Sequence, residues 1–190
     1  MVALFASVFM GIIFGVSLLL LMGIYNGLQS IKKQVKRNWE SVELFLKRRE
    51  EELPRLVELL VKIAPQEKAV LAKVSELRER FSNANSLADK ILISNEMTNI
   101  LASLFLIAEA YPELQRSGEF KMLQSRILEI EKQICARQEH FNTTIKVYNH
   151  RSSQFPDMFF AQTMGFHTLE FLKTYEDGVE ESNYDFRAAA

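Results

Sequence analysis

The sequence predicts an all-α protein in which a single N-terminal transmembrane helix is followed by an antiparallel up-and-down four-helix bundle. The stretch from Met1 to Ile31 contains no Asp, Glu, Lys or Arg. Beyond it, Leu, Ile, Val and Phe recur at helical spacing, which indicates amphipathic helices. Only three of the seven glycines lie beyond Gly27. Helix breakers are therefore rare, and the remaining chain is expected to be nearly all helix.

The apolar segment from Val2 to Ile24 is long enough to cross a bilayer, which takes roughly 20 residues of helix. A cleaved signal peptide begins with positive charge and ends at a small-residue cleavage site, and this segment has neither feature. We therefore expect residues 1–27 to be a retained membrane anchor. Positive charge follows the span and none precedes it, so the positive-inside rule predicts a cytoplasmic bundle and an N-terminus outside. The basic residues are Lys32, Lys33, Lys36 and Arg37.

Helix boundaries follow from prolines and capping residues. The first helix is expected to run from the span to about Ala64, where Pro65 stops it. A second is expected over 66–80. Ser86 and Asp89 form a capping-box pattern that begins the third. The fourth follows the sequence QRSGEF and ends at Pro156 at the latest.

These boundaries predict four segments. Residues 1–27 are the anchor, 28–156 the helical bundle and 157–175 an aromatic-rich C-terminal segment. Residues 176–190 are acidic and weakly apolar, so they are expected to be a disordered tail.

Charged residues interrupt the apolar stripes of the predicted bundle. Heptad spacing places Arg49 and Glu52 inward and Arg137 on the seam of the fourth helix. A hairpin that turns near Pro65 would bring Glu52 level with Arg78. A buried unpaired charge costs several kcal/mol, so these groups are expected to be paired or to reach an edge. They form either a polar layer that fixes helix register or a site for an acidic peptide or lipid headgroup.

The remaining charges of the run from Lys47 to Glu52 are expected on the outer face of the first helix. Lys47, Glu50 and Glu51 are predicted to face water. The proline two residues after the run, Pro54, is predicted on the outer face with a bend in the helix.

Two features of the membrane segment suggest association. Ser7, Gly11 and Gly15 share one helical face, and small residues let two spans approach closely. This face is therefore a candidate for self-association, although glycine is also common in membrane helices generally. The basic cluster Lys32, Lys33, Lys36 and Arg37 either serves as a topology signal or also attracts anionic headgroups.

Catalytic and metal-binding patterns are absent from the sequence. His140, His150 and His167 have no ligand spacing, and Cys135 is the single cysteine. There is no G-x-S-x-G elbow and no glycine-rich phosphate loop. The net charge of −1 gives no basic excess of the kind that nucleic-acid binders show. We therefore expect no metal, no cofactor, no nucleic-acid partner and no enzymatic activity.

An ordered set of short sequences resembles the LemA family of bacterial membrane proteins. The set is IYNGLQSIKKQVKRNW, LFLKRREEELPRLVELL, AEAYPEL, ARQEHFNTTIKVYN and FP. The matching positions are Tyr25, Asn26, Arg48, Arg49, Glu109, Tyr111, Pro112, Arg137, Asn142, Tyr148, Asn149 and Pro156. Departures occur where relatives read Ile-Pro-Asn-Leu-Val, His-Glu and Tyr-Asn, at Leu53 to Val57, Gln66 and Glu67, and Phe141 and Asn142.

The resemblance implies a single N-terminal span and a four-helix bundle at the bacterial inner membrane, but no reaction. The preferred hypothesis is a non-catalytic, membrane-tethered scaffold that binds other membrane or envelope proteins, its own copies included. The alternative is a ligand-binding or lipid-headgroup-binding protein, or an enzyme, that uses the arginine layer. The two differ in whether Arg49, Arg78 and Arg137 converge on an open pocket or are closed by Glu52 and its neighbours.

Overall fold

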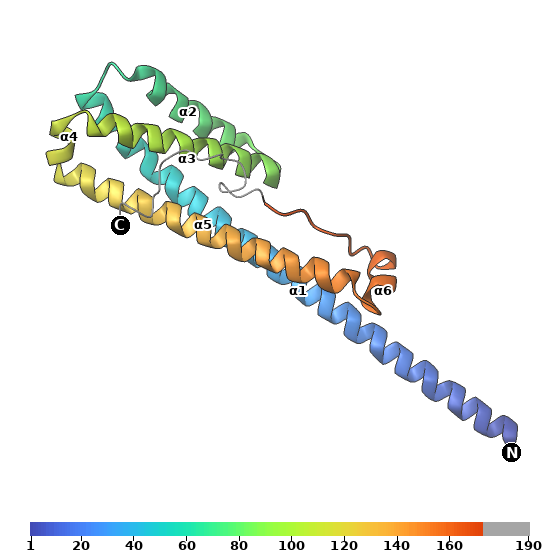
Figure 1. The fold of residues 1–190 in the computed structure, drawn as a ribbon. Coiled ribbons are helices and arrows are strands. Elements are labelled where there is room, and N and C mark those ends of the chain that lie inside the picture. Colours follow the sequence, from blue (N-terminus) through green and yellow to red (C-terminus); the bar gives the residue numbers. More distant parts are fainter. Residues whose placement is uncertain (173–190) are drawn as a thin grey trace. The chain divides into compact units, whose positions relative to one another are not determined.

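The structure, a computed structural model, describes residues 1–172 and is all-α in this range, with no strand. The predicted class, an apolar N-terminal helix followed by a helical bundle, is confirmed. The predicted tail at 176–190 and the last residues of the 157–175 segment lie outside the described range. The helices are α1 (Val2–Ile63), α2 (Lys68–Asn83), α3 (Leu87–Glu109), α4 (Pro112–Arg116), α5 (Gly118–Ser153) and α6 (Asp157–Thr163) (Figure 1).

Helix α1 runs without interruption from the predicted span to Ile63, one residue before the predicted end. The side chains of residues 4–20 are all exposed, as a lipid-facing segment requires. Pro54 lies inside α1 on an exposed position, and the helix continues beyond it. The backbone N–H of Ala64 still donates to the Leu60 carbonyl at 2.7 Å, so Pro65 follows the last helical bond.

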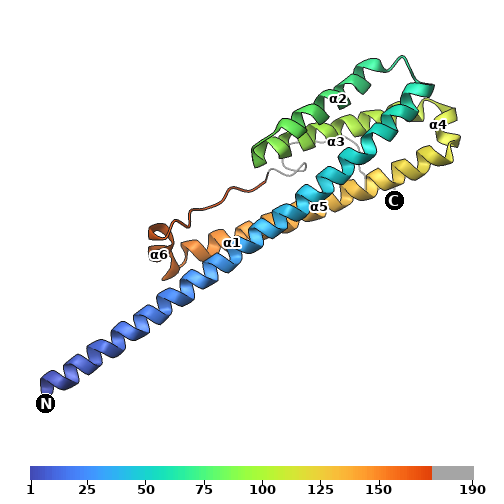
Figure 2. The same cartoon turned by 180° about the vertical axis from the view of Figure 1, so that it is seen from behind.

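Helices α2 and α3 lie side by side in both views of the ribbon (Figures 1 and 2). The predicted cap of α3 is confirmed, because Ser86 Oγ accepts from the Asp89 backbone N–H at 3.0 Å. Helix α3 is long and apolar enough to cross a membrane, yet 44% of its apolar 18-residue stretch is buried within the protein. It is therefore a core helix, as expected from its length and from Glu109 near its end.

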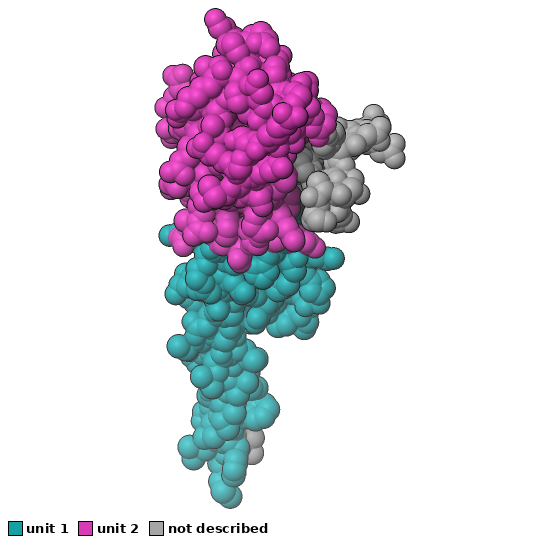
Figure 3. Space-filling view, turned by 90° about the vertical axis from the view of Figure 1, so that its left-hand side faces the viewer, with its two compact units in different colours: residues 1–39, 140–171 teal, residues 40–139, 172–190 magenta. Residues whose placement is uncertain are grey.

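The chain divides into two compact units (Figure 3). Unit 1 comprises residues 1–39 and 140–171, and unit 2 comprises residues 40–139 and 172–190. Both limits fall inside the long helices α1 and α5, so each of these helices contributes to both units. The predicted division at residues 27 and 156 stays a prediction.

The core of unit 2 is built by α1, α2, α3 and α5, each through one apolar stripe. Burying a single leucine stabilises the fold by about 1.5–3 kcal/mol, so these stripes supply most of the driving force. The up-and-down direction of successive helices stays a prediction. The side chains that are at most 1% exposed include Leu46, Leu53, Leu56, Leu60, Val74, Leu77, Met97, Leu101, Leu104, Phe120 and Ile127.

Unit 1 has its own smaller core. Trp39 packs edge-on against Phe141, with ring centroids 6.0 Å apart. Beside this pair the Asn38 amide donates to Thr144 Oγ1 at 2.7 Å, which satisfies a polar group that the stripe would otherwise bury alone. The buried apolar members of this core are Ile24, Leu28, Val35, Phe141, Ile145, Tyr148, Ala161 and Phe166.

Candidate functional site

Arg49 of α1 is a buried cation in the core of unit 2, with 1% of its surface exposed. Its Nη1 donates to Glu131 Oε1 of α5 at 3.0 Å, to Thr98 Oγ1 of α3 at 3.1 Å and to the Ser94 carbonyl at 3.4 Å. Its Nη2 donates to Ser94 Oγ at 3.0 Å. The guanidinium therefore joins three helices, and we call Arg49, Ser94, Thr98 and Glu131 the arginine layer.

The carboxylate of Glu131 completes the arginine layer. One oxygen accepts from Arg49, and the other lies 3.0 Å from the Thr98 hydroxyl. That hydroxyl is also 3.2 Å from the Ser94 carbonyl, but its single proton favours the charged acceptor. Both carboxylate oxygens are thus bonded, and Glu131 is 9% exposed. The layer carries one positive and one negative charge, which pair inside the bundle, and among residues 1–172 the buried Nε of Arg49 has no hydrogen-bond partner.

Glu131 was missed because only two positions of each seven-residue repeat were assigned to the seam of α5. Those positions hold Ile127, Ile130, Ile134 and Arg137. The repeat itself is kept, since Ile127, Ile134, Phe141 and Tyr148 are all buried. A third position of the repeat, which holds Glu131 and then Gln138, is buried as well. A stripe three positions wide, as core-facing bundle helices have, would have included both residues.

The prediction that Arg137 points inward is wrong. Its side chain is exposed, and the next residue, Gln138, is buried in its place. The Arg137 guanidinium lies over the Phe45 ring at 5.5 Å from the centroid, and Arg48 lies over the same ring at 4.9 Å. Two cations on one aromatic ring at the surface form a basic patch of unit 2.

Glu52 and Arg78 do not complete the arginine layer, which corrects the expectation that Glu52 would close it. The Glu52 carboxylate accepts from Arg126 Nη1 of α5 at 3.1 Å and lies 3.7 Å from Arg55 Nη1. Arg78 of α2 is half-buried, and among residues 1–172 its Nε has no hydrogen-bond partner. Glu52 therefore interacts with arginines of α1 and α5 outside the arginine layer.

Glu50 lies half-buried rather than on the water-facing side of α1, which corrects a second expectation from the heptad. Burial raises the pKa of its carboxyl, and the positive charge of Arg78 is the largest effect that opposes this. The Glu50 Oε1 atom is buried and, within the described range, accepts no hydrogen bond. Its charge is therefore less well solvated than it would be in the unfolded chain.

We expect Glu50→Gln to raise the melting temperature at pH 7. Because the folded-state pKa is the higher one, the folded chain binds this proton more tightly, and stability falls as pH rises from the ordinary value through the raised value. Above the raised pKa the carboxylate is charged, and the full cost of burying that charge lowers the stability of the folded chain. Glutamine is neutral and avoids this cost. Circular dichroism melts of the full chain in detergent from pH 4 to 8 measure this. Glu51→Gln, at an exposed neighbour, is the matched control. A lower melting temperature for Glu50→Gln would mean that attraction to Arg78 outweighs burial.

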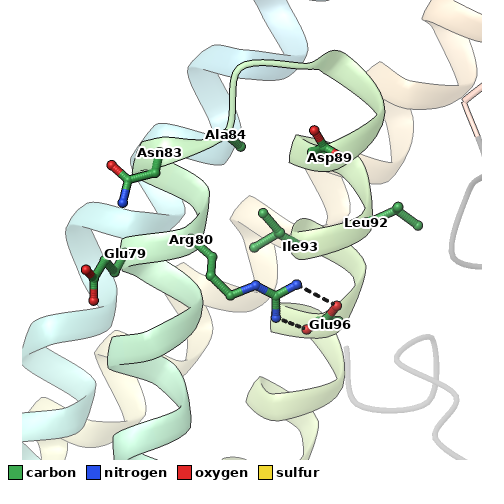
Figure 4. A pocket seen from close by; sticks show the side chains of 8 residues that line it. All are labelled: Glu79, Arg80, Asn83, Ala84, Asp89, Leu92, Ile93 and Glu96. Atoms are coloured by element: carbon green, nitrogen blue, oxygen red, sulfur yellow. Dashed lines mark hydrogen bonds and ion pairs between the residues drawn. The ribbon is translucent and has the colours of Figure 1, made fainter.

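A shallow depression of about 520 Å³ lies between the end of α2 and the start of α3 in unit 2 (Figure 4). Arg80 crosses it and holds Glu96 through two bonds of 2.8 and 3.2 Å. Its other charged lining residues, Glu79 and Asp89, are acidic. The depression thus offers no unengaged cation to an anionic ligand. Within residues 1–172 no group of three or more His, Cys, Asp or Glu is placed to hold a metal ion.

The predicted association face of the span is open. Ser7 Oγ donates to its own helix, at the Leu4 carbonyl, 2.9 Å away. A Cβ added at Gly11 or Gly15 would meet nothing within 4 Å. Past the span, the four basic residues Lys32, Lys33, Lys36 and Arg37 are exposed. Their proposed roles stay predictions.

Several of the residues that carry the family resemblance lie in unit 1. Tyr25 packs edge-on against Phe166, with centroids 5.9 Å apart. Tyr148 is 1% exposed, and burial raises the pKa of its phenol, which stays neutral. Asn149 holds residue 169 by both backbone groups: its Nδ2 donates to the Leu169 carbonyl at 2.8 Å, and its Oδ1 accepts from the Leu169 N–H at 2.9 Å. Asn26 lies exposed on α1, Asn142 lies half-buried on α5, and Pro156 lies exposed between α5 and α6.

The remaining positions lie in unit 2 around α4. Glu109 is the last residue of α3, and Pro112 begins α4, where its missing N–H costs nothing. Tyr111 stands between them, and its hydroxyl accepts from the Gln66 side chain. The Tyr-Pro pair therefore ends one helix, begins the next and contacts the connection after α1.

Comparison with known proteins agrees with the resemblance. The sequence model of the LemA family matches residues 38–186. The magnetosome protein MamQ of Magnetospirillum gryphiswaldense is 22% identical over 77% of this chain and 64% of its own length. Magnetosome proteins MamQ 2 and MamQ 1 of Paramagnetospirillum magneticum are each 28% identical over 40% of this chain and 28% of theirs. The chain thus spans at most about two thirds of the length of these relatives. The family match covers well over half of the chain, which therefore belongs to the LemA family and carries an apolar N-terminal helix of membrane-spanning length.

Proposed function

We propose that this protein is a non-catalytic, membrane-tethered scaffold that holds other membrane or envelope proteins, its own copies included. The observation that carries the proposal is the closure of Arg49. Four hydrogen bonds from its two terminal nitrogens go to Ser94, Thr98 and Glu131. Among residues 1–172 the buried Nε is the Arg49 nitrogen without a hydrogen-bond partner, so the guanidinium has a mainly structural role and little capacity for an incoming ligand. Joining α1, α3 and α5 at one level is what a register-fixing layer does.

The proposed orientation has the bundle in the cytoplasm of a bacterial cell and the N-terminus outside the inner membrane. Its support is the basic cluster that lies exposed directly after the span, namely Lys32, Lys33, Lys36 and Arg37. Positive charge next to a span favours the cytoplasmic side.

The alternative is a protein that binds an acidic peptide or a lipid headgroup. Its support is Arg78, whose Nε lacks a hydrogen-bond partner among the described residues. Arg48 and Arg137, over the Phe45 ring, add cations in the same unit. Arg137 is exposed over the Phe45 ring and is not part of the arginine layer, which favours the scaffold.

In-cell crosslinking followed by mass spectrometry tests the scaffold, with a variant that deletes the polar chemistry of the core. Arg49→Met with Glu131→Leu replaces a buried ion pair by apolar groups of similar size, a change that bundles tolerate. For a scaffold, the wild type and this double variant should capture the same specific partners. Loss of these partners by a variant whose circular dichroism spectrum is unchanged would favour ligand binding. A wild type with no specific partner would contradict the scaffold.

Self-association through the span gives a separate prediction. Gly11→Ile with Gly15→Ile places branched side chains on a face where a Cβ now meets nothing within 4 Å, so close approach of two spans is blocked. The homodimer signal in a bacterial membrane two-hybrid assay is expected to fall at least several-fold. Gly23→Ile, also open but eight residues beyond Gly15, is the control. An unchanged signal would remove this face from the proposal.

A further inference from the structure

The chain after α5 displays large apolar side chains to solvent. Phe155 is 82% exposed and Phe159 is 62% exposed, and their rings meet edge-on with centroids 6.2 Å apart. Met158, Met164 and Phe171 are exposed as well. All of them lie in residues 155–171, which we call the aromatic segment. Apolar residues gathered in this way usually mark a contact surface.

The aromatic segment is fastened at both ends. At its start, Arg151 Nε donates to Asp157 Oδ2 at 3.2 Å, which ties α6 to the end of α5. Near its end, Asn149 takes both backbone groups of Leu169. The exposed rings therefore lie on a segment that polar side chains of α5 hold near both ends.

The same segment lies against α1 where the apolar run ends. Phe166 is buried against Tyr25, and Lys32 Nζ lies over its ring at 5.5 Å. The Arg151 guanidinium packs on Gly27, where a Cβ would come within 2.8 Å of its Cζ atom. Residues 25–32 of α1 are thus the residues that hold the segment. These are also the residues at which a span from Val2 to Ile24 leaves the hydrocarbon.

We propose that the aromatic segment is a second membrane contact, which inserts Phe155, Met158 and Phe159 into the headgroup boundary of the bilayer that α1 crosses. Aromatic and apolar side chains next to a span are favoured at that depth. The exposed basic residues Lys32 and Lys33 lie on the same stretch of α1 and match anionic headgroups. The segment contacts α1 at Tyr25 and Lys32, directly after the exposed apolar residues of the span, and this position selects lipid over another protein as its occupant. The inference does not depend on the scaffold proposal.

Depth-dependent quenching of a single tryptophan tests the insertion. The chain has one native tryptophan, Trp39, which lies about 18 Å further along α1 than Gly27 at 1.5 Å per residue. Trp39→Phe with Phe159→Trp moves the reporter to the aromatic segment by exchanging one exposed aromatic ring for another. The full chain is reconstituted in phosphatidylethanolamine vesicles with or without phosphatidylglycerol, using lipids brominated near the headgroup end of the acyl chain.

The relocated tryptophan is expected to lose more than half of its fluorescence to brominated lipid, and to lose more when phosphatidylglycerol is present. The wild-type Trp39 is the matched reference and should be quenched far less. A relocated tryptophan that is quenched no more than Trp39 would overturn the proposal. A blue shift that depends on the ratio of protein to lipid, without bromine quenching, would assign the surface to a second copy of the chain and would also overturn it.

A reporter at Met164 shows whether the rings drive insertion. In a Trp39→Phe, Met164→Trp background, Phe155→Ser with Phe159→Ser should reduce the quenching several-fold. Equal quenching with and without these rings would contradict their role. An unchanged circular dichroism spectrum establishes that the serine variant is folded.

Discussion

Glu131→Leu is expected to lower the free energy of unfolding by about 3–5 kcal/mol, the largest effect of any single change considered. The variant leaves the Arg49 guanidinium buried at 1% exposure with no negative charge beside it. Leucine also removes the acceptor of the Thr98 hydroxyl. Chemical unfolding of the full chain in detergent, followed by circular dichroism, measures the loss.

Two further variants test whether the lost stability comes from the unpaired buried charge or from placing a leucine on α5. Arg49→Met with Glu131→Leu removes both charges and should recover most of the lost stability, because no uncompensated ion stays in the core. Glu129→Leu makes the same substitution two residues earlier, at an exposed side chain that accepts from Gln133 on its own helix, and should change stability little. A double variant as unstable as Glu131→Leu would contradict the assignment of the cost to Arg49.

Asn149→Ala is expected to release the aromatic segment from α5. It removes both hydrogen bonds to Leu169, each worth about 0.5–1.5 kcal/mol, so local opening should become easier by about 1–3 kcal/mol. Phe166 should lose its position against Tyr25, since Leu169 is no longer hydrogen-bonded to α5. Hydrogen exchange measured by mass spectrometry should show faster exchange in peptides covering residues 164–171.

Asn149→Asp tests the two hydrogen bonds to Leu169 separately. Asn149→Asp keeps the acceptor for the Leu169 N–H but sets a carboxylate oxygen against the Leu169 carbonyl, so it should be intermediate or as disruptive as alanine. Peptides of α3 serve as the internal reference and should exchange as in the wild type. Unchanged exchange at 164–171 in Asn149→Ala would show that packing alone holds the segment.

The helices could be predicted because their signals are local. Pro65 after an apolar stripe marked the end of α1 within one residue, and the Ser86 cap marked the start of α3. Helix α4 was not predicted, although the proline at position 112 is the usual first residue of such a helix. Elements were thus found wherever a breaker or a cap stood next to a strong periodicity.

The partners within the site could not be predicted because they depend on phase and register over long distances. Arg49 was expected to point inward, which agrees with its burial, but its carboxylate partner is 82 residues away on a helix whose predicted stripe was too narrow to include it. The expectation that Glu52 lies level with Arg78 assumed a tight hairpin near Pro65. The connection over residues 64–67 intervenes, and Glu52 pairs with Arg126 instead.

The spacing of the arginine layer along the chain has a consequence for synthesis. Translation proceeds at about 5–20 residues per second, so Arg49 is made roughly 4–16 s before Glu131, the carboxylate 82 residues later. During that interval α1 and α3 can meet only around an uncompensated charge. Assembly of the layer must therefore wait until α5 has emerged, and a nascent chain that stops short of residue 131 cannot neutralise its own core.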